Sequence, residues 1–323
     1  MIRICHSLVS IAAAALVLLS GAPSAHALDK IHAAKSAGVA WAFIPLDVGV
    51  DQGIFQKYGL DVDITVFAGD QKMQQALLSG SIDFGLGGGP AMSFTAKGAP
   101  IIGVAALFGA PKNISIVVAN DSPLKSPADL KGKMVSSSAV GSLTAWLVQQ
   151  VAIQQGWGPD GIKIAALGGF DAGLAALRTH QVDGMSSSVE GGLLLEEQKI
   201  GRNLTDMEHF APNFVTHVVF TRRDLLASNP DVINRFLKGL FATIAYMKTH
   251  KAETSKVAVS ELHETPGVAD KTYDDEIASF VPDGHFDPKG IAVLKKSFLD
   301  MEMLKTEPTD EQMFTTQFLP VKP

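Results

Sequence analysis

Cysteine is nearly absent from this chain of 323 residues. The only one, Cys5, lies in an N-terminal segment, residues 1–27, that has the composition of an export signal. Arg3 is its only charged residue, an apolar run extends from Leu8 to Leu19, and Ala25-His26-Ala27 is typical of a cleavage site. Removal of this segment would leave no cysteine, so neither a disulfide nor a cysteine nucleophile is expected.

Long hydrophobic runs are also missing. The run Leu8–Leu19 is shorter than the roughly 20 apolar residues that a membrane-spanning helix needs, and no later run is long and charge-free enough to cross a bilayer. No cysteine follows the run, so a lipid anchor is not expected either. The N-terminus therefore predicts a periplasmic protein that is secreted by its signal peptide and is not lipidated.

Basic residues are too few for a protein that binds nucleic acid. The chain has 27 Lys and Arg against 33 Asp and Glu, a net charge of -6 at pH 7, whereas nucleic acid attracts a basic face. Enzyme motifs are missing as well. There is no Gly-x-Ser-x-Gly elbow, and His263-Glu264-Thr265-Pro266-Gly267 lacks the second histidine of a zinc-binding helix. We expect no nucleic-acid partner, no metal, no cofactor and no catalysis.

What the sequence does contain is an alternation of strand and helix patterns in two successive runs. The first run predicts strands at 30–35, 61–67, 82–87 and 101–108 and helices at 45–57, 71–79 and 90–97. The second, introduced by a strand at 114–119, predicts strands at 133–136, 162–165 and 182–186 and helices at 142–155, 171–179 and 190–198. A strand at 215–220 and a helix from Asn229-Pro230-Asp231 to about His250 follow. This alternation predicts parallel strand pairing in an α/β fold.

One short pattern occurs in both runs. Ala76-Leu77-x-Ser79-x-x-Ile82-Asp83 returns as Ala176-Leu177-x-Thr179-x-x-Val182-Asp183, 100 residues later. Each copy ends a predicted helix, makes a tight turn and starts a short strand. The match at the same structural place favours two lobes of similar construction.

The chain resembles a known family through a series of short segments. They are Gly53-Ile54-Phe55 with Tyr58-Gly59-Leu60-Asp61-Val62, Leu78-Ser79-Gly80-Ser81-Ile82-Asp83, Gly98-Ala99-Pro100-Ile101, Ser126-Pro127-Ala128-Asp129-Leu130-Lys131-Gly132-Lys133, Val182-Asp183 and Asn229-Pro230-Asp231-Val232. In this order and spacing they resemble the substrate-binding proteins of ABC importers in the nitrate/sulfonate/taurine group. That group also includes binders of the thiamine pyrimidine precursor.

The resemblance implies a two-lobed, type II-like periplasmic binding protein of the α/β class. Each lobe is expected to be a mixed sheet flanked by helices, with crossovers near 114–121 and 214–221 acting as hinges. Residues 28–118 plus 220–323 would form lobe one, and residues 119–219 lobe two. The implied partners are a small-molecule ligand, held in the cleft between the lobes, and an ABC permease of the inner membrane. We expect the protein to be a monomer.

Candidate ligand-binding residues lie where predicted strands end and helices begin. They are Trp41, Phe43, Gly88, Gly89, Ser137, Ser138, Gly141, Ser142, Thr144, Asp171, Ser187 and Glu190. Trp41 and Phe43 form either an aromatic wall or ordinary core. The glycines allow close backbone approach, and hydroxyls with free amides at a helix start suit an oxyanion. Asp171 and Glu190 either contact the ligand or favour a helix start. His217 is expected to be a buried, hydrogen-bonded core histidine.

These residue types favour a small organic anion, either a sulfonate or a carboxylate. The serines and helix starts suit the oxyanion, while Trp41, Phe43, Phe67 and Phe170 leave room for an organic body. No Arg or Lys falls convincingly at a predicted strand end, so a neutral pyrimidine-like solute is the alternative ligand. Two alternative functions are an enzyme on the same scaffold, resembling a pyrimidine-precursor synthase, and a ligand-sensing partner of a membrane receptor.

Overall fold

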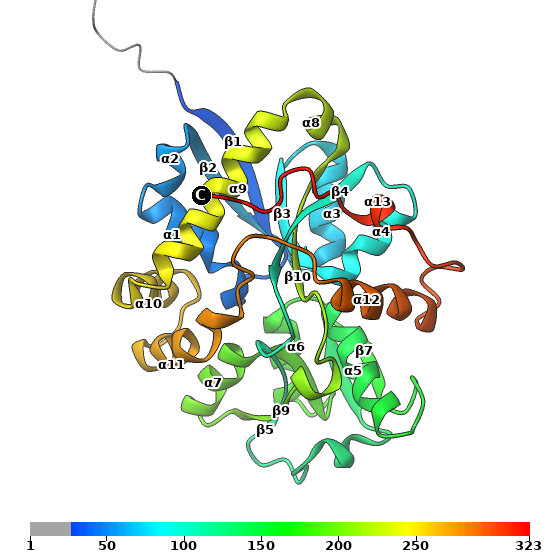
Figure 1. The fold of residues 1–323 in the computed structure, drawn as a ribbon. Helices are drawn as coiled ribbons and strands as arrows, with labels where there is room; N and C mark the ends of the chain where they lie inside the picture. The colour runs from blue at the N-terminus through cyan, green and yellow to red at the C-terminus, as the bar shows by residue number, and fades with distance from the viewer. Residues whose placement is uncertain (1–26) are drawn as a thin grey trace, which may run out of the picture.

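The computed structural model describes residues 27–323, which form two lobes built on two five-stranded sheets (Figure 1). The proposed signal peptide, residues 1–27, lies outside the described residues except for Ala27. Within the described part of the chain, no helix has both the length and the apolar character needed to cross a membrane. The fold class predicted from the sequence, α/β with two mixed sheets flanked by helices, is confirmed.

The first sheet has the strand order β2-β1-β3-β10-β4. Its strands are β1 (Asp29–Lys35), β2 (Leu60–Val66), β3 (Phe84–Gly88), β4 (Ile101–Phe108) and β10 (His217–Arg222). Strands β1, β2 and β3 are parallel, whereas β10 runs antiparallel to both of its neighbours. A strand from late in the chain therefore completes the sheet that the first run of strands begins.

The second sheet has the matching order β7-β6-β8-β5-β9. Its strands are β5 (Ile114–Ala119), β6 (Met134–Ser137), β7 (Lys163–Ala166), β8 (Gly184–Ser188) and β9 (Gly201–Asp206). Here β5 is the antiparallel member, paired with β8 and β9. The sequence analysis did not predict β9, because this edge strand carries polar residues such as Arg202 and Asn203 in place of an apolar pattern.

Helices cover both faces of each sheet. Their bounds are α1 (Ile44–Asp51), α2 (Ile54–Lys57), α3 (Asp70–Ser79), α4 (Met92–Ala96), α5 (Leu143–Gln154), α6 (Phe170–Arg178), α7 (Val189–Glu197), α8 (Arg223–Ser228), α9 (Pro230–Met247), α10 (Lys251–Glu261), α11 (Pro266–Glu276), α12 (Pro288–Asp300) and α13 (Asp310–Met313). The predicted helix 45–57 is wrong in one respect. It is two helices, because Gly53 adopts a left-handed backbone (φ 61°) that ends α1 and caps α2.

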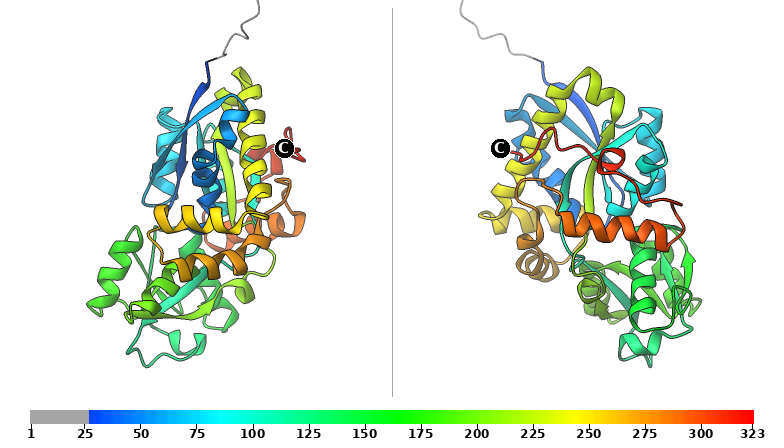
Figure 2. Two further views of the ribbon diagram at one scale, coloured as in Figure 1. Left: turned by 90° about the vertical axis from the view of Figure 1, so that its left-hand side faces the viewer. Right: turned by 45° about the vertical axis from the view of Figure 1, so that its right-hand side comes forward.

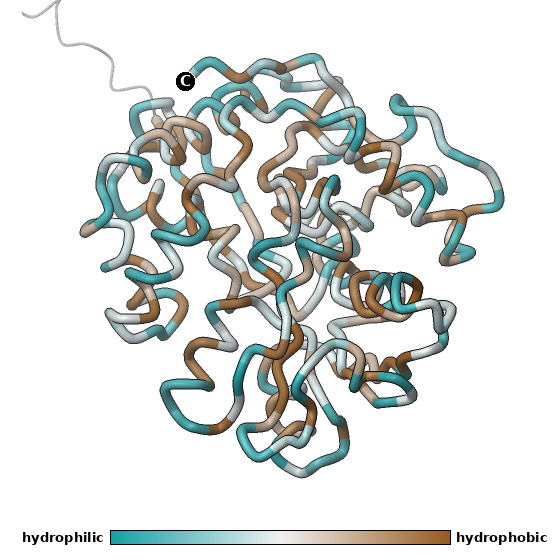
Figure 3. The backbone as a smooth tube through the Cα atoms, turned by 60° about the horizontal axis from the view of Figure 1, so that its bottom comes forward, coloured by the Kyte–Doolittle hydropathy of each residue, from teal (hydrophilic) through white to brown (hydrophobic). Residues whose placement is uncertain are grey.

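Strand β10 shows how the first sheet is buried on both sides. Val219 belongs to the apolar cluster that contains Phe236 of α9, whereas Val218 and Phe220 belong to the cluster that contains Met73 of α3. Successive side chains of a strand point to opposite faces, so both faces of β10 are core. Hydrophobic stretches accordingly run through the interior, and hydrophilic ones lie in outer turns (Figure 3).

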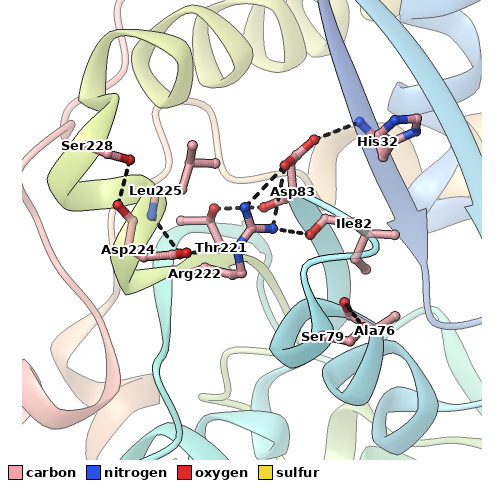
Figure 4. Close-up of polar contacts among 10 residues, drawn as sticks. All are labelled: His32, Ala76, Ser79, Ile82, Asp83, Thr221, Arg222, Asp224, Leu225 and Ser228. Carbon is pink, nitrogen blue, oxygen red and sulfur yellow. Dashed lines mark hydrogen bonds and ion pairs between the residues drawn. The ribbon is translucent and has the colours of Figure 1, made fainter.

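The repeated sequence pattern has a common structural cause. The Asp83 carboxylate accepts a hydrogen bond from the backbone N–H of His32 (3.0 Å), which ties the start of β3 to β1. The Asp183 carboxylate accepts one from the backbone N–H of Met134 (2.9 Å), which ties β8 to β6 in the same way. In the first sheet Arg222 adds a bond to the carbonyl of Ile82 (2.5 Å) and contacts Asp83 (Figure 4).

The chain passes between the sheets twice, through residues 109–113 and 207–216. Both connections start before the crossovers predicted at 114–121 and 214–221, because much of those segments already forms β5 and β10. Helices α10–α12 then lie along the boundary between the lobes (Figure 2). The lobe limits expected from the sequence, 28–118 with 220–323 and 119–219, remain a prediction.

We predict that Asp83→Ala lowers the free energy of unfolding by about 1 to 3 kcal/mol, because the backbone N–H of His32 and the half-buried Arg222 lose a charged partner. The change is measured by urea denaturation. The matched control is Asp63→Ala, which removes only an exposed contact with the His32 ring and should cost less than about 1 kcal/mol. Equal losses for the two variants would contradict a structural role for Asp83.

Candidate functional site

A cavity of about 390 Å³ lies between the lobes, where strands of the two sheets end opposite one another. From the first lobe it is lined by residues after β1 and β2 and by the end of β3. From the second it is lined by the ends of β6 and β8 and by the loop after β7. The carboxyl ends of parallel strands are where α/β folds place their ligands. The cavity has the size expected of a site for a small molecule.

Seven of the twelve candidate residues line this cavity. They are Phe43, Gly88, Ser137, Ser138, Thr144, Asp171 and Ser187. The other five, which are Trp41, Gly89, Gly141, Ser142 and Glu190, are not among its lining residues. The structure therefore brings candidates from both lobes together at this cavity.

Trp41 and Gly89 have structural roles. Trp41 is fully buried against Tyr273 and Phe280, with ring centroids 6.1 and 5.5 Å away. At Gly89, an added Cβ would lie 2.0 Å from the carbonyl oxygen of Val215, so the glycine lets the backbone pass against the segment before β10. Core packing, the alternative for Trp41 in the sequence analysis, is what the structure shows.

Ser142, Gly141 and Glu190 shape the starts of helices. Ser142 is the N-cap of α5 and accepts a hydrogen bond from the backbone N–H of Ala145 (3.3 Å). Gly141 has a left-handed backbone (φ 72°) in the preceding turn. Glu190 is fully buried in the first turn of α7 and accepts a hydrogen bond from the backbone N–H of Trp41 (2.5 Å). It connects the two lobes behind the cavity.

Several polar atoms that line the cavity have no protein partner. Among the described residues, the hydroxyls of Ser137 and Ser186 and the Nδ1 atom of His217 are buried without a hydrogen bond. Ser138 differs, because its hydroxyl pairs with Thr144 at 3.1 Å. Buried polar groups are nearly always hydrogen-bonded in folded proteins. These atoms belong to residues that line the cavity, so a bound molecule is a candidate partner for them.

The charge of the cavity is acidic. Its charged lining residues within the described chain are Asp70 and Asp171, and no Lys or Arg is among them. The Asp70 carboxylate accepts a hydrogen bond from the backbone N–H of Gly88 (2.8 Å). Burial raises the pKa of Asp70 despite this bond. A second negative charge in this cavity would be repelled, whereas an N–H donor would be attracted.

His217 also lines the cavity, which corrects its expected role as a hydrogen-bonded core residue. Its ring packs edge-on against Phe43, 4.9 Å away, and against Phe108, 5.9 Å away. Burial lowers the pKa of His217 to about 3, so the imidazole is neutral at physiological pH. His217 therefore adds no positive charge to the cavity at physiological pH.

Sequence reasoning missed the lining residues Ser36 and Asp70 and took His217 for a core residue. Asp70 follows the predicted strand 61–67 and precedes the helix 71–79, which is the same signal that identified Ser137 and Ser187. The rule that ligands lie at strand ends would have found it. Nothing in the local pattern distinguishes His217 from a core histidine.

The two lobes approach closely at the cavity rim. A Cβ added at Gly169 would lie 3.8 Å from Cβ of Ala68, and one at Gly69 would lie 4.0 Å from the carbonyl oxygen of Ser138. Each pair joins a loop of one lobe to a loop of the other. The structure thus has the lobes drawn together around the cavity.

A second, larger groove of about 600 Å³ lies on the first lobe beside α1 and α10. Its most buried charged residues are already paired, because Lys35 Nζ contacts both carboxylate oxygens of Asp47 at 2.8 Å. Within the described residues, no group of three or more His, Cys, Asp or Glu side chains is placed to hold a metal ion. The interlobe cavity is therefore the candidate site.

Comparison with protein families gives a match to the model described as NMT1/THI5 like, over residues 41–254. A curated protein from Brucella abortus (strain 2308), which is named as a binding protein, is 24% identical over 200 residues. This match covers 61% of the present chain and 60% of the length of that relative.

Solved structures with the same fold include binding proteins and an enzyme. The alkanesulfonate-binding protein SsuA from Xanthomonas axonopodis pv. citri, bound to MOPS, has a TM-score of 0.77 at 19% identity, over 89% of this chain and 98% of that one. A protein from Bordetella bronchiseptica RB50 has a TM-score of 0.76 at 23% identity, over 90% and 95%. The desulfurization enzyme DszB has 0.65 at 14% identity, over 90% and 97%. At these identities the likeness concerns the fold.

We predict that acid destabilises the protein partly through His217. Its pKa is about 3 when folded and 6.5 in an unfolded chain, so between these values the unfolded state binds the extra proton. The stabilisation is full above pH 6.5 and is lost as the pH falls toward 3. His217→Gln should flatten the loss of urea stability over this window. The same pH slope in His217→Gln and wild type would show that His217 is not the cause.

Proposed function

The chain belongs to the NMT1/THI5-like family, and on that premise we propose that it is an extracytoplasmic protein that binds a small organic solute and delivers it to an ABC importer. In this proposal the protein is exported to the periplasm by residues 1–27, acts as a monomer and presents its loaded form to a permease in the inner membrane. The fold supports it, since two lobes around a cavity suit capture and release.

The observation that carries the proposal is the set of polar groups that line the cavity from both lobes. The Asp70 carboxylate and the unpaired Nδ1 atom of His217 belong to the first lobe, and the unpaired hydroxyls of Ser137 and Ser186 belong to the second. A solute that satisfies groups on both sides is held best when the lobes are together. Binding then shifts the population toward the closed form, which the permease recognises.

We propose that the solute is neutral and offers N–H donors, such as a pyrimidine-like ring, in preference to an anion. Asp70 lines the cavity, and neither Lys nor Arg does so within the described residues. Burying a carboxylate or sulfonate beside Asp70 without a cation would be costly. Phe43, Phe67 and Phe170 give the ring an apolar surface. The anion expected from the sequence is thus the second candidate.

A specific observation still favours that second candidate. Ser137, Ser138 and Thr144 lie where β6 leads into the N-terminus of α5, which attracts negative charge. An oxyanion group of the solute could bind at this helix N-terminus, away from Asp70.

Catalysis is less well supported than binding as the function of this cavity. The described residues contain no cysteine, and the His217 imidazole, with its pKa lowered to about 3, would be a weak base. We propose binding without chemical change to the solute.

We predict that Asp70→Asn weakens the binding of a neutral N–H donor by about tenfold or more, because a hydrogen bond to a charged acceptor contributes about 1.5 to 3 kcal/mol. Titration calorimetry measures the effect, after a thermal-shift screen of pyrimidines, sulfonates, carboxylates and nitrate. At 100 times its dissociation constant a solute should stabilise the protein by about 2.7 kcal/mol.

The sign of the Asp70→Asn effect separates the two ligand classes. For an anionic solute the same variant should bind more tightly, because it removes a like charge. Asp160→Asn, an exposed carboxylate outside the cavity, is the control and should leave binding unchanged. Tighter binding of a sulfonate by Asp70→Asn, with no pyrimidine bound by wild type, would overturn the neutral-solute proposal.

A further inference from the structure

Three buried glutamates lie together behind the cavity, at a joint between the lobes. Glu190 starts α7, which packs on the second sheet. Glu264 lies between α10 and α11, and Glu276 ends α11, which packs against α7 (Figure 1). Their exposed fractions are 0%, 5% and 2%. We refer to them as the carboxyl cluster.

The carboxyl cluster has almost no hydrogen-bond partners. Only Glu190 Oε1 has one, the backbone N–H of Trp41, which itself crosses from one lobe to the other. The other carboxylate oxygen of Glu190 and both oxygens of Glu264 and Glu276 are buried without a partner among the described residues. Three ionised carboxylates in such a place would repel one another and would lack solvation.

Nearby charges do not neutralise the carboxyl cluster. On the surrounding helices Lys251 pairs with Asp274 (2.6 Å) and Lys271 pairs with Asp275 (2.7 Å). Glu197 of α7 accepts a hydrogen bond from the Thr265 hydroxyl (2.8 Å).

The two remaining titratable neighbours have no bond to the carboxyl cluster either. The Tyr273 hydroxyl bonds to the carbonyl of Met247 (2.6 Å), and His263 is exposed. None of the three glutamates lines the interlobe cavity or the larger groove. A proton is therefore the ligand that these carboxyl groups have room to take up.

We propose that the carboxyl cluster is a proton-dependent latch for the lobes. It is protonated while the α7–α11 joint is closed and gives up its protons when the joint opens to water, so that closure takes up protons. The latch regulates the solute site and in this respect rests on the proposed function.

The pKa values give the sign of the effect. Burial raises the pKa of Glu190 to about 7, and burial together with the charge of Glu190 raises that of Glu264 to about 8. Burial raises the pKa of Glu276 well above 4.5, and Glu190 and Glu264 add to the rise. In the open form these groups regain ordinary values near 4.5. Proton uptake therefore favours closure fully below pH 4.5, and this contribution weakens as the pH rises toward 8.

The first test measures closure without solute. In a Cys5→Ala background, spin labels at Gln198→Cys in lobe two and Ala252→Cys on α10 report the distance across the joint. We expect the short-distance population to fall as the pH rises from about 5 to about 8, by up to about tenfold per pH unit for each proton. In Glu276→Gln the change should be smaller, and in Glu190→Gln/Glu264→Gln/Glu276→Gln it should vanish.

Glu196→Gln is the matched control, because it removes an exposed carboxyl from the same helix α7; it should behave as wild type. A distance that does not respond to pH in wild type, or responds equally in Glu276→Gln, would overturn the latch. If the triple variant does not fold, Glu276→Gln alone decides.

The second test separates the latch from the proposed function. Calorimetric titration of a solute in two buffers of different ionisation heat should show net proton uptake in wild type and less uptake in Glu276→Gln. Binding without proton uptake would refute the latch and leave solute binding standing. Failure of every solute to bind would refute the proposed function, while the label distances would still decide the latch.

Discussion

The boundary between the two lobes has to bury polar groups that the protein itself does not pair. In the cavity these groups are the hydroxyls of Ser137 and Ser186 and the Nδ1 atom of His217. Behind it they are the carboxyls of Glu190, Glu264 and Glu276. Such burial is costly unless something binds. In the proposed account a solute satisfies the first set and protons satisfy the second, so that both ligands act on the same equilibrium between open and closed lobes.

The lobes themselves are built to stay rigid while that boundary changes. Asp83 and Asp183 fasten corresponding strands in the two sheets through backbone hydrogen bonds. The two aspartates lie directly before β3 and β8, at the starts of these strands. The cavity lies at the opposite ends of the strands. In the proposed account, opening changes the two connecting segments, 109–113 and 207–216, and the side-chain contacts across the boundary.

Much of the fold could be predicted from sequence because the alternation of strand and helix is local. The two runs, the family resemblance and the repeated pattern that ends in Asp83 and Asp183 follow from short patterns. Edge strand β9 was missed because its partly exposed residues carry no apolar signal. Gly53 divides a predicted helix because its left-handed backbone depends on the turn and not on periodicity.

The candidate site was predicted only in part, for physical reasons. Strand ends identified Ser137 and Ser187, since topology brings such ends together. Trp41 and Glu190 have the same positions relative to strands but face the joint behind the cavity, and that depends on packing against helices α10 and α11 from much later in the chain. The acidic character of the cavity also depends on long-range packing, because it comes from Asp70 in the first lobe and Asp171 in the second, which lie 101 positions apart in the sequence.

A crystal structure of the protein with its tightest-binding solute tests the central claim most directly. The account predicts a neutral molecule in the interlobe cavity, with an N–H group within hydrogen-bond distance of Asp70 and other atoms bonded to Ser137 or Ser186. A solute that contacts one lobe only, or an anionic group seated beside Asp70, would contradict it.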